Sequence, residues 1–431
     1  MLIDSSLTIG QRFKQIRAEK GFSQSDVAEG ICSKTVVSHL ENDRQYPSAI
    51  MLGKLADKLG VPLREIMGMQ EQQFEAGFRI DMISVYIEKS DYEHALKHIE
   101  DLSGNENLLE HQKTELFVYH VDCLNKTGRY HEAVDKVLPF LEEQEANKSV
   151  SEETLCILYN KLGRAYFNLN DFERAFSTFQ QGYRISLKFR TFDIVAARVT
   201  KNLGLVCNQL GYKQDARKYL EKAYQFYESS ADLTGIADTL FALAIASGDG
   251  SYLAKAKAIY ESQNLIHEAN VVKQHFAFHV ESKLNYKDAV DKLQSSAKEF
   301  ERLGDYGMGM YTLSRAVVLC VKNEDATSAQ EILLKAEAYR EQMGKEDPFM
   351  LGLYYIARSK LSLLIREFDD CIHHANIASE MCAIMGMNAD SADALQMIAN
   401  AYRLQGNVDK AYEVMVKVAH LLRESQRRNS V

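Results

Sequence analysis

Histidine pairs are the residues whose spacing first suggests chemistry, because two imidazoles on one surface can bind a metal ion. His275 and His279 are four residues apart and would share one helix face, but Glu281 is the one carboxylate close by in sequence. His373 and His374 are adjacent, and adjacent side chains point in different directions from a helix. The sequence therefore predicts no metal site.

Motifs of catalysis are also missing from the sequence. It contains no phosphate-binding G-x-x-x-x-G-K-S/T, no zinc-binding H-E-x-x-H and no nucleophile elbow G-x-S-x-G. We therefore expect no catalytic residues, no cofactor and no enzymatic activity, so that the chemistry to be explained is binding.

Composition indicates a globular protein of more than one domain. The chain has 431 residues, 46% hydrophobic and 26% charged, and lacks the run of about 18 apolar residues that a membrane helix needs. Its seven cysteines are spread widely without a C-x-x-C pair, which favours reduced thiols over a disulfide or zinc framework. The start lacks the basic and apolar segments of a secretory signal. These features predict a cytoplasmic protein that does not bind membranes.

Charge is distributed unevenly along the chain. The segment 1–68 carries nine Lys and Arg against eight Asp and Glu, whereas the segment 69–431 carries 42 against 52. An acidic body does not attract nucleic acid through its bulk charge. Any contact with DNA is therefore expected from the segment 1–68.

Short helices are predicted over this first segment. Ile9, Phe13 and Ile16 form an apolar stripe at helical spacing. Hydroxyl residues suited to cap a helix precede the next apolar groups: Ser23 with Asp26 three residues later, then Ser33, then Ser48. The pattern indicates helices separated by tight turns, with a small core of its own.

This pattern resembles the helix-turn-helix of the lambda-repressor class between Ile9 and Met67. The most specific match is Ser23-Gln24, Val27-Ala28 and the run Val37-Ser38-His39-Leu40-Glu41-Asn42. In that class the second helix enters the major groove and its first residues meet base edges. The resemblance assigns DNA-binding roles to Gln24, Ser33, Lys34, Thr35, Ser38, His39, Asn42 and Arg44.

Chemistry supports this assignment at the start of the second helix. Lys34 can donate to guanine, and Thr35 offers a hydroxyl and a methyl group. Asp43 departs from the class, which usually has Gly there, and places a negative charge that Arg44 can offset. The alternative is a small helical domain that only packs or dimerises; Lys34, Thr35 and His39, rather than acids, at the exposed positions favour DNA binding.

A repeat follows the first domain. Small residues recur before a bulky apolar one, with numbers that differ by 35 to 42 from one to the next: Ala95, Ala133, Ala175, Ala216, Ala254, Ala289, Ala329, Cys371 and Ala411. Such a period is typical of stacked helical hairpins, in which the small residue lets two helices approach closely. The sequence predicts about nine of these units.

Two of the units resemble tetratricopeptide repeats most closely. One carries Leu162-Gly163, Tyr166, Phe172, Ala175 and Phe179, and the next carries Leu203-Gly204, Ala216, Leu220 and Ala223. The resemblance implies an all-α chain: a lambda-repressor-like helix-turn-helix domain at 1–68, a linker at 69–76, and a right-handed α-solenoid at 77–431 that binds peptides and forms oligomers.

The concave groove of such a solenoid is lined by the first helix of each unit. Carboxamides can hold both the N–H and the C=O of a peptide backbone, and Arg or Lys can bind its carboxylate. Positions of this kind are Asn160, Arg164, Asn168, Arg198, Lys201, Asn202, Asn208, Gln274, Tyr311 and Arg315. The alternative is that these residues form solvated helix faces or salt bridges between repeats.

The combination of this head and these repeats resembles the RNPP family of peptide-sensing quorum regulators in Gram-positive bacteria, and its NprR-like branch most. That resemblance implies a homodimer, or a tetramer, that binds a two-fold symmetric promoter site in double-stranded DNA and is switched by a short signalling peptide. The pair Asn160 and Asn202, from consecutive units, matches the asparagines with which the family holds a peptide backbone.

Two other functions stay open on sequence grounds. One is a Rap-like or bifunctional protein whose repeats bind a sporulation response regulator and promote its dephosphorylation. The other is a peptide-controlled regulator of a phage or mobile element. The last repeat presents Met397, Met415, Val418 and Leu421, which predicts a dimer contact among the C-terminal repeats.

Overall fold

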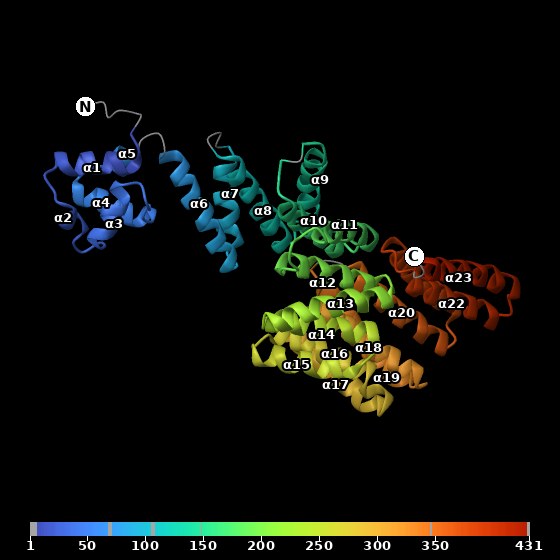
Figure 1. Ribbon diagram of the computed structural model, residues 1–431. Coiled ribbons are helices and arrows are strands. Elements are labelled where there is room, and N and C mark those ends of the chain that lie inside the picture. Colours follow the sequence, from blue (N-terminus) through green and yellow to red (C-terminus); the bar gives the residue numbers. More distant parts are fainter. Residues whose placement is uncertain (1–6, 68–70, 105–107, 148, 345–346, 429–431) are drawn as a thin grey trace. The chain divides into compact units, whose positions relative to one another are not determined.

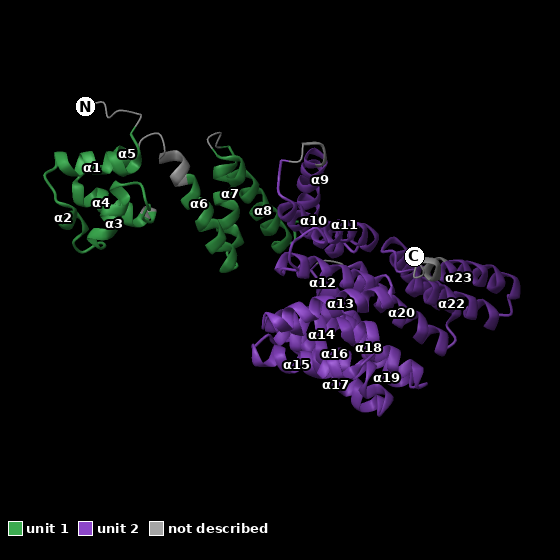
Figure 2. Ribbon diagram, in the orientation of Figure 1, with its two compact units in different colours: residues 1–129 green, residues 130–431 purple. Residues whose placement is uncertain are grey.

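The computed structural model describes residues 7–67, 71–104, 108–147, 149–344 and 347–428, and all regular structure in these ranges is helical (Figure 1). The chain divides into two compact units, residues 1–129 and 130–431 (Figure 2). None of the described helices is both long and apolar enough to span a membrane. The predicted all-α class, a helix-turn-helix followed by an α-solenoid, is confirmed.

Five short helices form the head of unit 1: α1 (Ile9–Glu19), α2 (Gln24–Ala28), α3 (Lys34–Glu41), α4 (Ala49–Leu59) and α5 (Leu63–Met67). Their core contains Phe13, Val37, Leu40, Leu52 and Leu55, all with no exposed surface. The predicted caps are confirmed, because the hydroxyls of Ser23, Ser33 and Ser48 each accept a hydrogen bond from a first-turn N–H. These caps fix where α2, α3 and α4 begin.

The rest of unit 1 consists of α6 (Glu71–Glu88), α7 (Tyr92–Ser103) and α8 (Glu110–Lys126). Ile80, Ile83, Ala95 and Ile99 pack together in its core. Of the predicted linker at 69–76, residues 69 and 70 lie outside the described residues, and α6 begins at Glu71. The domain boundaries predicted from sequence stay a prediction.

Unit 2 is a row of helices of similar length. Its helices are α9 (Tyr130–Asn147), α10 (Glu152–Asn168), α11 (Phe172–Ser186), α12 (Ile194–Gln209), α13 (Lys213–Ser229), α14 (Leu233–Ser247), α15 (Gly250–Ser262), α16 (Ile266–His279), α17 (Tyr286–Arg302), α18 (Tyr306–Lys322), α19 (Ala326–Gln342), α20 (Pro348–Leu364), α21 (Phe368–Ile384), α22 (Asn388–Leu404) and α23 (Val408–Arg428). From α10 onward, consecutive helices pack in pairs. Counted in chain order from α10 to α23, the described helices make seven packed pairs, and α6 with α7 makes one more in unit 1; the predicted number of about nine hairpins stays a prediction.

Small residues allow the two helices of each hairpin to pack closely. Ala175 and Ala216 are the fourth residues of α11 and α13, and both are fully buried. On the first helices, a Cβ atom added to Gly163 would lie 2.6 Å from the ring of Phe179, and one added to Gly204 would lie 2.6 Å from Leu220. Any larger residue at these glycines would therefore push the two helices of the hairpin apart.

One predicted packing residue is wrong. Ala254 is exposed, and the fourth residue of α15 is the buried Leu253. The reason is local, because Asp249 caps α15 through the backbone N–H of Ser251 and so fixes its first turn. With that start, Ala254 points outward and Ala256 becomes the fully buried small residue of the helix.

Two distant segments of unit 2 touch. The side-chain nitrogen of Asn170 donates to Asp347 Oδ1 at 3.2 Å, across 177 positions of sequence. Beside this bond the ring of Phe172 meets that of Phe349 edge to face, with 6.5 Å between centroids. We name these four residues the closure contact. It returns the start of α20 to the turn between α10 and α11.

Candidate functional site

The first turn of α3, the second helix of the helix-turn-helix, is exposed. Val37 and Leu40 face the core, whereas Ser33, Lys34 and Thr35 are exposed. Ser33 also caps the helix, since its hydroxyl accepts from the backbone N–H of Val36 at 3.4 Å. The side chains of Lys34 and Thr35 are therefore available to a partner without any change in the core.

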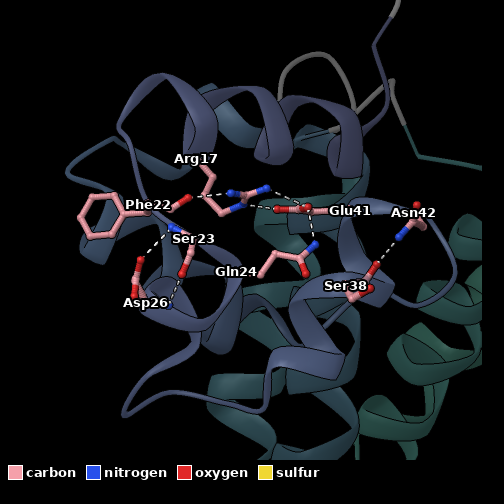
Figure 3. Close-up of polar contacts among 8 residues, drawn as sticks. All are labelled: Arg17, Phe22, Ser23, Gln24, Asp26, Ser38, Glu41 and Asn42. Atoms are coloured by element: carbon pink, nitrogen blue, oxygen red, sulfur yellow. Dashed lines mark hydrogen bonds and ion pairs between the residues drawn. The ribbon is translucent and has the colours of Figure 1, made fainter.

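A buried polar cluster around Glu41 holds α3 against α1 and α2 (Figure 3). Arg17 donates through Nε and Nη2 to the two carboxylate oxygens of Glu41, and through Nη1 to the backbone oxygen of Phe22 at 2.6 Å. Gln24 Nε2 donates to Glu41 Oε2 at 2.7 Å, which uses one of its two amide hydrogens. The cluster fixes the angle between the two helices of the helix-turn-helix.

The remaining predicted DNA-binding residues lie near the end of α3. Ser38 and His39 are half-buried, and Asn42 and Arg44 are exposed. Asn42 donates through Nδ2 to the backbone oxygen of Ser38 at 2.7 Å, so its amide closes the last turn of α3 (Figure 3). The DNA-binding roles of these residues stay a prediction.

Asp43 has a structural role that the sequence did not indicate. Its φ of 52° lies in the left-handed region that Asp tolerates better than most residues. Its carboxylate accepts hydrogen bonds from Thr8 Oγ1 at 2.6 Å, Gly10 N at 3.1 Å and Tyr46 Oη at 2.9 Å. Burial disfavours its charge, but these bonds outweigh burial and hold the pKa of Asp43 below its usual value. The negative charge is thus stabilised within the head.

We expect Asp43→Ala to destabilise the head, because it removes three hydrogen bonds worth about 1 kcal/mol each. The lowered pKa also gives a pH dependence. The ionised form stabilises the fold above the pKa of the unfolded chain, about 4, and this stabilisation is lost as the pH falls through the lower folded value. Urea unfolding of wild type and variant between pH 3 and pH 7 measures both effects. A difference that stays constant across that range would contradict the pH dependence, and no difference at any pH would contradict the destabilisation.

In unit 2 the two predicted backbone-binding asparagines meet. Asn202 Nδ2, from α12, donates to Asn160 Oδ1, from α10, at 2.8 Å. Both side chains are half-buried. A carboxamide has two donor hydrogens and two acceptor lone pairs, so each residue can make further bonds. The pair presents a donor and an acceptor side by side at the junction of two repeats.

Other predicted groove residues are used inside the protein. Lys201 Nζ lies 2.6 Å from Asp238 Oδ2, an ion pair between repeats of the kind left open by the sequence. Asn168 donates to the backbone oxygen of Arg164 at 2.8 Å and so caps its own helix. Arg198 is exposed. Lys201 and Asn168 are therefore less suited to bind a peptide than the sequence suggests.

A cavity of about 400 Å³ lies inside unit 2, and we name it the repeat cavity. The first helices α12, α14, α16, α18 and α20 each contribute to its wall, for example with Leu205, Phe241, Gln274, Tyr311 and Leu353. Met385 and Met387, from the turn between α21 (Phe368–Ile384) and α22 (Asn388–Leu404), also line it, as does Asp390 on α22. Its size and mostly apolar wall are typical of small-ligand sites.

Polar groups converge at one place in this wall. Arg315 donates to Gln274 Oε1 at 3.1 Å and to Tyr311 Oη at 3.0 Å, so the structure brings these three predicted residues together. Asn208, also in the wall, donates to the backbone oxygen of Ala242 at 2.9 Å. Its Oδ1 and Gln274 Nε2 are buried, and neither atom has a hydrogen-bond partner among the described residues. The repeat cavity thus has unused hydrogen-bonding capacity.

The histidine pair is part of the same wall. His275 packs edge to face on Phe241, 4.9 Å between centroids. Burial, followed by the charge of Arg315, holds the pKa of His275 well below its usual value, so this ring is neutral near pH 7. Within the described ranges, no group of three or more His, Cys, Asp or Glu side chains is arranged to hold a metal ion.

Sequence reasoning missed several residues of the cavity. Phe349 stacks on Tyr311 with 5.7 Å between centroids and joins the cavity wall to the closure contact. Asp390 faces the cavity from α22, where burial raises the pKa of its carboxyl. No short-range pattern marks these residues, since their partners come from other repeats.

Fold and site define a protein with a repressor-type helix-turn-helix head and tetratricopeptide-like repeats, which is the architecture of the RNPP-type regulators. The helix-turn-helix family model matches residues 13–66 and the tetratricopeptide repeat model residues 153–229. The chain is 33% identical over 98 residues to the immunity repressor protein of Bacillus phage phi105, covering 20% of this chain and 68% of that protein. It belongs to the same helix-turn-helix repressor family.

Solved structures share the fold at low sequence identity. A Rap protein complexed with competence and sporulation factor covers 82% of this chain and 99% of its own, with 12% identity and a TM-score of 0.63. The quorum sensor NprR from B. thuringiensis, in its apo form, covers 81% and 99% with 13% identity and a TM-score of 0.55. NprR in complex with its cognate peptide NprX covers 81% and 98% with 12% identity and a TM-score of 0.53.

Proposed function

We propose that this protein is a cytoplasmic DNA-binding transcriptional regulator controlled by a short signalling peptide bound among its repeats. The observation that carries the DNA part is the first turn of α3, where Lys34 and Thr35 are exposed on a helix anchored by Val37 and Leu40. In repressor-type heads these are the positions that meet base edges in the major groove.

The peptide part of the proposal is supported by the groove. The Asn160–Asn202 pair offers the donor and acceptor that an extended backbone needs, and the repeat cavity offers apolar wall and unused polar atoms. Two proteins of the same fold have been solved with ligands, NprR with NprX and a Rap protein with competence and sporulation factor. Quorum sensing is the role that fits such a combination.

Two experiments test this function. Mass spectrometry of molecules that co-purify with the protein from its own culture should find a peptide, and selection from random duplexes should recover a two-fold symmetric site. Recovery of no preferred DNA site would contradict the DNA-binding part.

Similarity to a phage repressor favours one of the alternatives left open above, a regulator carried by a phage or mobile element. The mechanism would be the same, with a target site on the element itself. The remaining alternative, action on a response regulator, is tested by following the phosphate on a phosphorylated response regulator with and without this protein. Accelerated loss would support it.

We further propose that the protein is a homodimer joined through α23. Val408, Tyr412, Met415 and Leu422 are exposed by 66%, 72%, 41% and 42% and lie on one face of this helix. The sequence-based choice of residues was partly wrong, because Val418 is buried and Met397 and Leu421 are partly buried. Positions 411 and 418 face inward, and the exposed stripe runs beside them along the same helix.

We expect the double variant Tyr412→Glu, Met415→Glu to be monomeric, because two carboxylates would have to be buried in the interface. Light scattering measures the mass. The matched control is Leu284→Glu, which adds a charge at a residue that is 88% exposed outside α23. A dimer that survives the double variant would place the contact elsewhere.

A further inference from the structure

Arg315 is a buried cation for which the described residues provide no counter-ion. The residue is 7% exposed, and its guanidinium lies over the rings of Tyr311 and Phe278 at 4.8 and 4.9 Å from their centroids. Its hydrogen bonds go to neutral groups, Gln274 Oε1 and Tyr311 Oη. In the described part of the chain no carboxylate is paired with it. Burying a charge without an opposite one is costly.

The next repeat contains the same arrangement with its counter-ion present. Tyr354 and Arg358 stand 43 positions after Tyr311 and Arg315, and Arg358 donates to Tyr354 Oη at 2.9 Å. Arg358 also forms an ion pair with Glu337 Oε1 at 3.0 Å. Arg315 has only a neutral acceptor of this kind, the amide of Gln274, which comes from α16 rather than from the second helix of the preceding repeat. Arg358 thus has a carboxylate partner, whereas Arg315 has neutral ones.

The position of Arg315 indicates where that carboxylate comes from. Arg315, Gln274 and Tyr311 line the repeat cavity, and the buried Gln274 Nε2 has no hydrogen-bond partner. A bound carboxylate could accept from both Gln274 Nε2 and the guanidinium, which would satisfy the amide and neutralise the charge together. Apolar residues such as Phe241, Ile356 and Met385 line the same space.

We propose that the Arg315–Gln274 cluster is a receptor for a carboxylate of the ligand, next to an apolar side chain. The inference rests on the proposed function, in which the ligand is a short peptide. The carboxylate is then either the C-terminal group of the peptide or the side chain of an Asp or Glu, two sources with the same chemistry.

Other ionisable groups line the repeat cavity. His275 is neutral, and His279 stacks on it with 5.7 Å between centroids. Asp390 lines the cavity from α22 and is not paired with Arg315. Asp393→Asn is the matched control, since it removes a carboxylate from an exposed position of the same helix, outside the residues that line the cavity.

The first test needs no ligand. Gln274→Glu places a carboxylate at the Arg315 guanidinium and should raise the thermal midpoint of the full-length protein by about 2 °C or more. Glu337→Gln, the reverse change at Arg358, should lower it. A carboxylate at position 274 could fit poorly and lower the midpoint for that reason alone. Arg315→Gln avoids this problem, since it removes the unpaired charge itself and should leave the midpoint unchanged or raise it. A lowered midpoint in both Gln274→Glu and Arg315→Gln would overturn the proposal.

The second test uses random pentapeptide pools, one with free C-termini and one with C-terminal amides, retained on the protein and read by mass spectrometry. Wild type and Asp393→Asn should retain carboxylate-bearing peptides roughly tenfold better than neutral ones, and Gln274→Glu should lose that preference. Preference for free C-termini identifies the terminal carboxylate; retention of only Asp- or Glu-containing amides identifies the side chain. If neutral peptides were retained as well as carboxylate-bearing ones, the Arg315–Gln274 cluster would not be a carboxylate receptor, although the protein would still bind peptides. Retention of neither pool would contradict the proposed function and, with it, the peptide as the source of the carboxylate.

Discussion

Replacing Lys34 and Thr35 with Ala should strongly reduce the preference of the protein for its own DNA site. Both side chains are exposed on the first turn of α3, and neither contributes to the core. Each good base contact is worth about 1–3 kcal/mol of discrimination, so the ratio of specific to random binding should fall by about tenfold or more per contact. The fold should be unaffected, because the caps and the Glu41 cluster remain.

The measurement is competition between the selected site and random duplex at fixed salt, because phosphate contacts depend strongly on ionic strength. Lys97→Ala is the matched control, since it removes the same charge from an exposed position on α7, outside the helix-turn-helix. Gln24→Ala should instead weaken binding to all sequences about equally. An unchanged specificity ratio in the double variant would mean that α3 does not read bases.

Asn202→Ala should weaken binding of the co-purifying peptide about tenfold or more. The change removes a partner of the peptide backbone and also breaks the bond from Asn202 to Asn160, and a lost buried amide partner costs about 1–3 kcal/mol. Asn168→Ala is the matched control on α10, because the Asn168 amide is directed to its own helix. Calorimetry measures both affinities. Equal losses in the two variants would mean that the pair does not hold the peptide.

The same titrations, repeated with bound DNA, test whether the two sites communicate. If the peptide controls DNA binding, its affinity must change when the operator is present, and DNA affinity must change by the same factor when the peptide is present. Couplings of this kind usually amount to about 5- to 150-fold. Identical peptide affinities with and without DNA would leave a DNA-binding protein and a peptide-binding groove without a switch.

Local features of the fold could be predicted from the sequence. The hydroxyl caps at Ser23, Ser33 and Ser48 act within three residues of themselves, so their signal is complete in a short window. The small residues at the fourth position of the second helices are nearly as local, and they failed only at Ala254, where the cap at Asp249 sets the helix phase.

Contacts between repeats could not be predicted. The ion pair of Lys201 with Asp238 spans 37 positions, and the bond of Asn170 to Asp347 spans 177. Such pairs depend on how much each hairpin rotates against the previous one, and small rotations add up along the row. Asp43 was missed for a related reason, because its partners Thr8 and Gly10 lie 35 and 33 positions earlier in the chain.

The closure contact has a consequence for how this protein can evolve. Solenoids whose ends are open can gain or lose a unit by duplication or deletion, because each unit contacts only its neighbours. Here Asn170 and Phe172 must meet Asp347 and Phe349 across 177 positions. A helical hairpin added or deleted between them would separate the two halves of the closure contact. It would also open the wall of the repeat cavity at Phe349. The copy number of this stretch is therefore fixed by geometry, and new ligand specificity must come from point substitutions in the existing units.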